Sequence, residues 1–345
     1  MSDLYPLGKL PHDVLAALLA RYPVPDPRVI VGARPGLDAA IIDLGASHLL
    51  VAKTDPITFA TEEIGWYAVN INANDVACTG GVPVWFMVTL LLPENTATSA
   101  LVEKIFDQIG TACHALGVSV VGGHTEITYG IDRPIVVGVM LGLVEKGRMI
   151  TAGGAQPGDA LIVTKGIPIE ATAIIAREKA DLLRDKFSPD FLARCANYLY
   201  TPGLSVVRDA SVAVRAGRVH AMHDPTEGGL ATGLWEMAEV SGKCLRVNCT
   251  SAILADGAVL CTATGLDPLG AIASGALLMA VHPDDAQQIM TALHTQGIQS
   301  YLIGHVEEGP PAVVDMASGG RLLPRPARDE IARLFESEEA GDSSG

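Results

Sequence analysis

Apolar residues in the middle of the first half follow two different periods. Residues 65–79 place apolar side chains at helical spacing, whereas 84–92, VWFMVTLLL, is rich in the aromatic and β-branched residues that buried strands prefer. No charge occurs over the 18 positions of 76–93, about the length of a membrane span, but Gly80 and Pro83 would break a spanning helix. The pattern predicts a helix, a glycine turn and a buried strand, with no membrane partner.

Further predicted elements fall into two successive parts of the chain. In the first part they are a short helix at 10–22, strands at 39–45 and 48–55, an amphipathic helix at 98–117, and strands at 118–128 and 133–145. In the second part they are a strand at 160–165, a helix at 170–183, more helices to about residue 240, and strands near 274–282 and 300–306. Strands and helices alternate in both parts, which predicts an α+β fold of the α/β type.

Glycine and proline concentrate at 147–159, GRMITAGGAQPGD, a composition typical of a boundary between domains. We therefore predict an N-terminal domain at 1–150 and a C-terminal domain at 155–335. Residues 336–345 are mostly acidic or small and offer no apolar anchor, so we predict that they form a disordered tail.

Composition and charge exclude several classes of function. With 345 residues, 49% of them hydrophobic, the chain can bury a sizeable core. The net charge of −15 and the lack of a Lys/Arg cluster argue against a nucleic-acid partner, so an anionic ligand must be held by metal ions or backbone N–H groups. The first residues lack a signal-peptide pattern, and the six cysteines lack C-x-x-C spacing. We therefore expect a cytoplasmic protein with reduced thiols.

Acidic and amide side chains stand at strand ends or beside glycines in the first half, namely Asp38, Asp55, Asn74, Asp75 and Glu126. Carboxylates on short loops at strand ends are how a protein gathers Mg²⁺ and, through it, a polyphosphate. Each residue could instead be a turn or cap residue, since Asp and Asn favour such positions. Asp75 favours the functional interpretation most, because a charge inside an apolar helix is rarely buried without a partner.

Two motifs in the second half could meet an anion. In HDPTEGG, residues 223–229, Thr226 is a possible N-cap and the two glycines begin a helix, so this helix start could bind an anion or be a capping motif only. Lys165, at the end of a strand, could neutralise a transferring phosphoryl group or be merely solvated. His223 is more simply explained as a structural histidine.

Four segments carry a resemblance to a known superfamily. They are GWYAVNINANDVACTGGVPVWFMVTLLLPE at 65–94, VVGGHTEIT at 120–128, HDPTEGGLATGLWEMAE at 223–239 and LDPLGAIASGALLMAV at 266–281. Together they resemble the superfamily of aminoimidazole ribonucleotide (AIR) synthetase (PurM), thiamine-monophosphate kinase, selenophosphate synthetase and HypE, and most of all its HypE-like, AIR synthase-related branch. The resemblance implies a two-domain PurM-like fold. In that fold the N-terminal mixed sheets pair across a homodimer, the C-terminal domain is an α/β sandwich, and Mg-ATP binds in the cleft.

The resemblance also implies roles for individual residues. Binding of Mg²⁺ against the ATP phosphates is assigned to Asp38, Asp55 and Asp75. Contacts to the nucleotide are assigned to these three and to Asn74, Gly122, Gly123, Thr125, Asp224, Thr226 and Glu227. The catalytic candidates are Lys165, His124 and Glu126. The chain contains no P-loop, which fits a superfamily that binds ATP without one.

The chain departs from the family pattern at three places. Leu37 precedes Asp38 where many members have two adjacent aspartates, which leaves the number of metal ions open. His124 stands where kinases and HypE proteins have the aspartate of GGDT, and it could orient a phosphate or make a structural hydrogen bond. HypE proteins carry a carbamoyl group on a cysteine at the extreme C-terminus, whereas the last cysteine here is Cys261.

The function implied is that of an ATP-dependent enzyme of the HypE/AIR synthase-related type. It would use Mg-ATP to activate an amide, carbonyl or phosphate-like oxygen, with a small-molecule or protein-bound carbonyl or carbamoyl group as acceptor. The alternative is a non-catalytic nucleotide-binding maturation or regulatory accessory protein. The changes at Leu37 and His124 and the missing C-terminal cysteine motivate that alternative.

Overall fold

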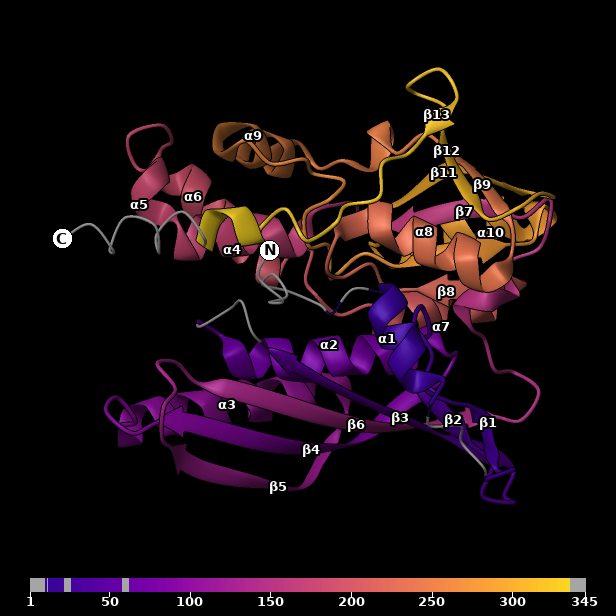
Figure 1. Ribbon diagram of the computed structural model, residues 1–345. Coiled ribbons are helices and arrows are strands. Elements are labelled where there is room, and N and C mark those ends of the chain that lie inside the picture. Colours follow the sequence, from indigo (N-terminus) through magenta and orange to yellow (C-terminus); the bar gives the residue numbers. More distant parts are fainter. Residues whose placement is uncertain (1–9, 11, 22–25, 58–61, 336–345) are drawn as a thin grey trace.

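The computed structural model describes residues 10, 12–21, 26–57 and 62–335 (Figure 1). The predicted tail at 336–345 lies outside these residues. The chain forms two mixed sheets, one from each half, and helix α2 (Ile64–Cys78) lies between the first sheet and the second half (Figure 1). The predicted α+β fold is confirmed.

The first half is a six-stranded sheet in the order β1-β2-β3-β6-β4-β5, antiparallel except for the parallel β4–β5 pair. Burial alternates along β4 and β6, because α2 and α3 pack on one face and leave the other more exposed. The bounds are α1 His12–Leu19, β1 Val29–Val31, β2 Ala40–Ile42, β3 His48–Ile57, β4 Val82–Pro93, α3 Ser99–Leu116, β5 Ser119–Thr128 and β6 Ile135–Glu145.

The second half is a seven-stranded sheet in the order β13-β12-β9-β11-β7-β10-β8, in which only the β9–β12 pair is parallel. Its strands are β7 Ala160–Thr164, β8 Val219–His223, β9 Cys244–Val247, β10 Leu278–Val281, β11 Ser300–Glu307, β12 Ala312–Asp315 and β13 Arg321–Leu322. Its α-helices are α4 Ile169–Glu178, α5 Ala180–Leu183, α6 Pro189–Ala196, α7 Val207–Ala216, α8 Gly229–Ser241, α9 Ala255–Thr264 and α10 Pro283–Thr295. Short 3₁₀ turns occur at Ala152–Gly154, Asn197–Leu199 and Thr250–Ala252.

Helix α2 is buried on all sides. Of its 15 residues only Trp66 is not fully buried, so the helix has no polar stripe, as expected for a helix enclosed by protein. Most of its apolar side chains belong to one hydrophobic cluster that includes residues of α4 and α6 from the second half. The polar side chains of α2 must therefore find partners inside the protein.

The second half differs from the sequence prediction in several places, and strands β9, β12 and β13 and helices α9 and α10 were not predicted. Strand β8 lies inside the region predicted to hold only helices, because its histidines interrupt the apolar run and its burial comes from pairing with β10. The helix predicted at 170–183 is divided into α4 and α5 at Lys179. Within the described ranges, every helix is too short or too polar to cross a bilayer.

Candidate functional site

A cavity of about 640 Å³ opens between the two halves of the chain. Its wall comes from the loop before β2, from β3 and α2, and from the segments that follow β8 and β13. The carboxylates in this wall are Asp38, Asp55, Asp75, Asp224, Glu227, Glu236 and Asp329, and its basic side chains include Arg34, Lys53, Arg325 and Arg328. The volume is typical of small-molecule sites.

Lys53 on β3 joins two of the cavity carboxylates. Its Nζ lies 2.9 Å from Asp75 Oδ1 and 3.2 Å from Asp55 Oδ2. Burial alone would lower the pKa of Lys53, but Asp75 and Asp55 raise it well above its ordinary value, so the ammonium stays charged. The second oxygen of Asp75, Oδ2, is buried and has no hydrogen-bond partner among the described residues.

Asn72 on α2 positions Asp55 through its backbone. Its Oδ1 accepts from the Asp55 N–H at 2.8 Å, and its Nδ2 donates to the Asp55 carbonyl at 3.2 Å. Gly138 lies opposite Asp55 on β6, and a Cβ there would come within 2.5 Å of Asn72 Nδ2. The glycine therefore makes room for the amide that holds the acidic end of β3, a role that sequence reasoning missed for both residues.

His223, at the end of β8, bridges two carboxylates at the cavity wall. Its Nδ1 is 2.6 Å from Asp38 Oδ1, and its Nε2 is 2.8 Å from Glu236 Oε2 on α8. Burial alone would lower the pKa of His223, but Asp38 and Glu236 raise it well above its ordinary value. The ring is therefore an imidazolium that donates to both. Its structural role agrees with the sequence interpretation, but its place at the site does not follow from sequence.

Asp224 follows His223 and is almost completely buried. Its Oδ1 accepts a hydrogen bond from Cys78 Sγ at 3.6 Å, while its Oδ2 is buried without a hydrogen-bond partner in the described part of the chain. Burial and then the charge of Asp38 raise the pKa of Asp224 to about 7. The wall thus contains two buried carboxylate oxygens, of Asp75 and Asp224, that lack a donor.

The start of α8 differs from the prediction for HDPTEGG. Gly228, with φ 78°, is the N-cap instead of Thr226. Asp329 Oδ2 accepts from the Gly228 N–H at 2.6 Å, and its Oδ1 accepts from Ile272 N–H at 3.2 Å. The protein's own carboxylate therefore occupies this helix start, although Thr226 and Glu227 still line the cavity.

The structure brings six of the predicted site residues to the cavity and places seven elsewhere. The six are Asp38, Asp55, Asp75, Asp224, Thr226 and Glu227. The seven that are not part of the described cavity wall are Asn74, Gly122, Gly123, His124, Thr125, Glu126 and Lys165.

Asn74 and Lys165 both hold the segment before α7. Asn74 Nδ2 donates to the Leu204 carbonyl and its Oδ1 accepts from the Val206 N–H, each at 2.8 Å, so the side chain ties α2 to the second half. Lys165 Nζ donates to the Ser205 carbonyl at 2.6 Å and lies 3.6 Å from Asp209. Burial lowers the pKa of Lys165 against the opposing effect of Asp209. The lysine is thus neither solvated nor at the cavity.

The GGHTE turn lies on β5, the exposed edge strand of the first sheet. His124 Nε2 is 3.2 Å from Glu126 Oε2, and both side chains are more than half exposed. A Cβ at Gly123 would collide with the carbonyl oxygen of Val88 on β4, so close packing of the two strands requires this glycine. In a single chain, these residues are remote from the cavity.

We expect Asp224 to make the ligand-free protein less stable as the pH rises from about 4 to about 7. The pKa of Asp224 is about 7 in the folded state against a reference value of 3.8, so between these values the folded state keeps a proton that the unfolded state has lost. One such group changes the free energy of unfolding by at most about 1.4 kcal/mol per pH unit. His223, whose pKa is also raised, acts in the same direction but mainly above its reference value of 6.5.

Urea unfolding of the wild type and of Asp224→Asn at pH 5 and pH 6.5 isolates the aspartate. The wild type should lose up to about 2 kcal/mol more than the variant over this interval. Equal losses in the two proteins would contradict the assignment.

The chain has one mixed sheet in each half and an acidic cavity between the two halves. This is the architecture of a PurM-like two-domain protein. The chain belongs to the AIR synthase related family and lies in its HypE-like branch. The N-terminal domain model of the family matches residues 36–144, and its C-terminal domain model matches residues 156–316. The predicted family and the PurM-like fold are thereby confirmed.

Individual relatives agree with this assignment. The chain is 28% identical over 316 residues to the carbamoyl dehydratase HypE of Rhizobium leguminosarum bv. viciae, covering 87% of this chain and 86% of the relative. It is 29% identical over 308 residues to the selenide, water dikinase of Aeromonas salmonicida, covering 87% and 85%. A crystal structure of the hydrogenase maturation protein HypE in complex with ATP has the same fold, with a TM-score of 0.69 and 24% identity over 88% of this chain and 90% of that one.

Proposed function

We propose that the chain is a Mg-ATP-dependent enzyme that activates an amide, carbonyl or phosphate-like oxygen of a substrate or partner protein. The observation that carries the proposal is the set of aspartates at one cavity, two of which have a buried oxygen without a donor. Support comes from relatives named as a carbamoyl dehydratase and a dikinase, and from the HypE structure with ATP. A protein with a net charge of −15 needs such a local device to hold a polyphosphate.

The residues at the cavity fit Mg²⁺, since its preferred ligands are carboxylate oxygens. Asp38, Asp55, Asp75 and Asp224 would hold it, and the unpartnered oxygens of Asp75 and Asp224 have no competing donor. When bound, Mg²⁺ would neutralise charge on phosphate oxygens. Lys53 adds a fixed cation to the set, held between Asp55 and Asp75.

The chain's own residues orient this set. Asn72 fixes the backbone at Asp55, and His223 fixes the carboxylate of Asp38 from the side of the second half. Rigid placement of charges before a ligand arrives lowers the cost of arranging them during the reaction. The six cysteines lie within the described residues, and five are buried, so we propose that a carbamoyl or carbonyl acceptor comes from another molecule.

The test combines binding with product analysis. Calorimetric titration should show ATP binding that requires Mg²⁺ and is lost with EDTA, and incubation with carbonyl, carbamoyl or phosphate acceptors should release ADP or AMP. The absence of ATP binding both with Mg²⁺ and with EDTA would overturn the proposal. Tight binding without any nucleotide product would instead favour the non-catalytic accessory role.

We also propose that the first halves of two chains pair as a homodimer. Exposed apolar side chains gather on β4 and on the β5 edge, namely Val82, Trp85, Met87, Val120, Val121 and Ile127. A sheet edge and face of this kind are normally covered by another chain or element. Such pairing would explain how GGHTE could reach a nucleotide, since the partner chain would bring a second cavity toward β5.

We expect Val121→Glu to give a monomer. Val121 is 54% exposed, and a charge there would be buried without a partner in a β5 interface. Light scattering should give twice 36.0 kDa for the wild type and 36.0 kDa for the variant. Val259→Glu on α9, where Val259 is 43% exposed, is the matched control and should stay dimeric. A wild type of 36.0 kDa at micromolar concentration would refute the dimer.

A further inference from the structure

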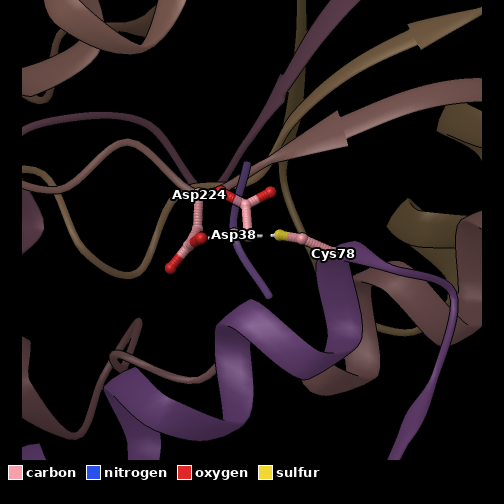
Figure 2. Close-up of side chains that lie close together, drawn as sticks. All are labelled: Asp38, Cys78 and Asp224. Atoms are coloured by element: carbon pink, nitrogen blue, oxygen red, sulfur yellow. Dashed lines mark hydrogen bonds between the residues drawn. The ribbon is translucent and has the colours of Figure 1, made fainter. Parts of the chain in front are cut away.

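Three potential metal ligands of different chemistry converge beside the cavity (Figure 2). Asp38 comes from the loop before β2, Cys78 is the last residue of α2, and Asp224 follows β8. Their ligand atoms all lie within 4.8 Å of one another, and Cys78 Sγ is 3.6 Å from Asp224 Oδ1. Asp38 and Asp224 line the cavity, whereas Cys78 is buried and is not part of the described wall.

A second observation points to a cation at this place. Asp224 is only 2% exposed, and its Oδ2 has no hydrogen-bond partner in the described ranges. An unpartnered buried carboxylate oxygen is costly, and a cation bound by both oxygens of Asp224 would satisfy it.

The carboxylate of Asp38 is also held in place from outside the trio. His223 lies 2.6 Å from Asp38 Oδ1 and is itself fixed by Glu236 at 2.8 Å. Outer contacts of this kind orient metal ligands in known sites. Cys78 is equally fixed, because it ends a helix that is buried on all sides. The three ligands therefore meet at the junction of the two halves, where Asp38 is held by His223 and Cys78 by α2.

We propose that Asp38, Cys78 and Asp224 bind a thiophilic divalent cation of the Zn²⁺ class. The site shares Asp38 and Asp224 with the proposed Mg²⁺ site, and to that extent it rests on the proposed function. The choice of a thiophilic cation depends on Cys78 alone. A thiolate ligand selects Zn²⁺ over Mg²⁺, which prefers oxygen. Binding replaces the S–H bond of Cys78 with a sulfur–metal bond and releases the proton to solvent. Three protein ligands leave a position for water or for a ligand in the cavity.

Titration of the metal-free full-length protein with Co²⁺, a spectroscopic substitute for Zn²⁺, tests the site. We expect a thiolate-to-cobalt charge-transfer band that saturates at one ion per chain, is displaced by Zn²⁺ and resists excess Mg²⁺. Cys78→Ser should abolish the band and weaken binding by at least about tenfold, in line with the loss of a ligand contact. Cys113→Ser is the matched control, because Cys113 on α3 is a buried thiol within an apolar cluster, and it should keep the band.

A wild type without the band, or a band that Cys78→Ser retains, would overturn the proposal. Zinc-edge X-ray absorption of the wild type with one equivalent of Zn²⁺ needs no variant: a sulfur neighbour supports the site, and an oxygen-only shell overturns it. Mg-ATP calorimetry on the same preparation separates the two proposals. Intact Mg-ATP binding without a cobalt band would refute only the proposed thiophilic site. A cobalt band without Mg-ATP binding would refute only the proposed function.

Discussion

Asp75→Asn will remove Mg-ATP binding and leave the protein folded. Asparagine keeps the shape of the side chain but removes the charge that pairs with Lys53 and the unpartnered Oδ2 proposed to meet Mg²⁺. Lys53 still pairs with Asp55 at 3.2 Å, so the lysine is not left without a carboxylate. We expect a loss of at least 100-fold in affinity, or about 2.7 kcal/mol, by calorimetric titration.

The matched control is Asp43→Asn in the same half. Asp43 also pairs with a lysine, Lys146, at 2.8 Å, but it lies outside the described cavity wall. Its neutralisation should leave ATP affinity unchanged. Circular dichroism must show both variants folded, and an unchanged affinity for Asp75→Asn would refute the role of Asp75.

Asn74→Ala will destabilise the whole protein more than Asn70→Ala on the same helix. The side chain is completely buried, and it satisfies the Leu204 carbonyl and the Val206 N–H, each at 2.8 Å. Its removal leaves two buried backbone groups without partners, at about 1–3 kcal/mol each, so we expect a loss of about 2–6 kcal/mol. Urea unfolding followed by circular dichroism measures this loss.

Asn70→Ala provides the control for Asn74→Ala. Asn70 is also buried on the same helix, but among the described residues its amide donates only to the Trp66 carbonyl one turn earlier. The two substitutions therefore remove the same atoms and differ in the contact between the halves. If the two substitutions lower the free energy of unfolding by the same amount, the hydrogen bonds of Asn74 to the second half do not add to the stability.

Local patterns account for what could be predicted from the sequence. The helix at 65–79 and the strand at 84–92 match α2 and β4 closely, because period and glycine turns are visible within each segment. Asp75 stood out because it interrupts an apolar run. Asp38, Asp55 and Asp224 could be assigned to one site only through family resemblance, since their meeting depends on the packing of the two sheets.

The partners of these residues could not be predicted, because they lie far away along the chain. Lys53 is separated from Asp75 by a turn and a helix, and His223 meets Asp38 across the junction of the halves. Lys165 was misleading because a lysine at a strand end looks the same in sequence whether it is solvated or buried against carbonyl groups. Only the fold decides between these cases.

Because α2 is enclosed by both halves, the domain boundary predicted at 147–159 does not separate two units that fold independently. A fragment cut at the glycine- and proline-rich segment 147–159 would keep the first sheet but expose the side of α2 that packs against α7 and shares a hydrophobic cluster with α4. That fragment would present a wide apolar surface and two orphaned amide contacts of Asn74 to water. Neither half should therefore fold stably without the other. Expression of either half alone should yield aggregated protein instead of an independent domain.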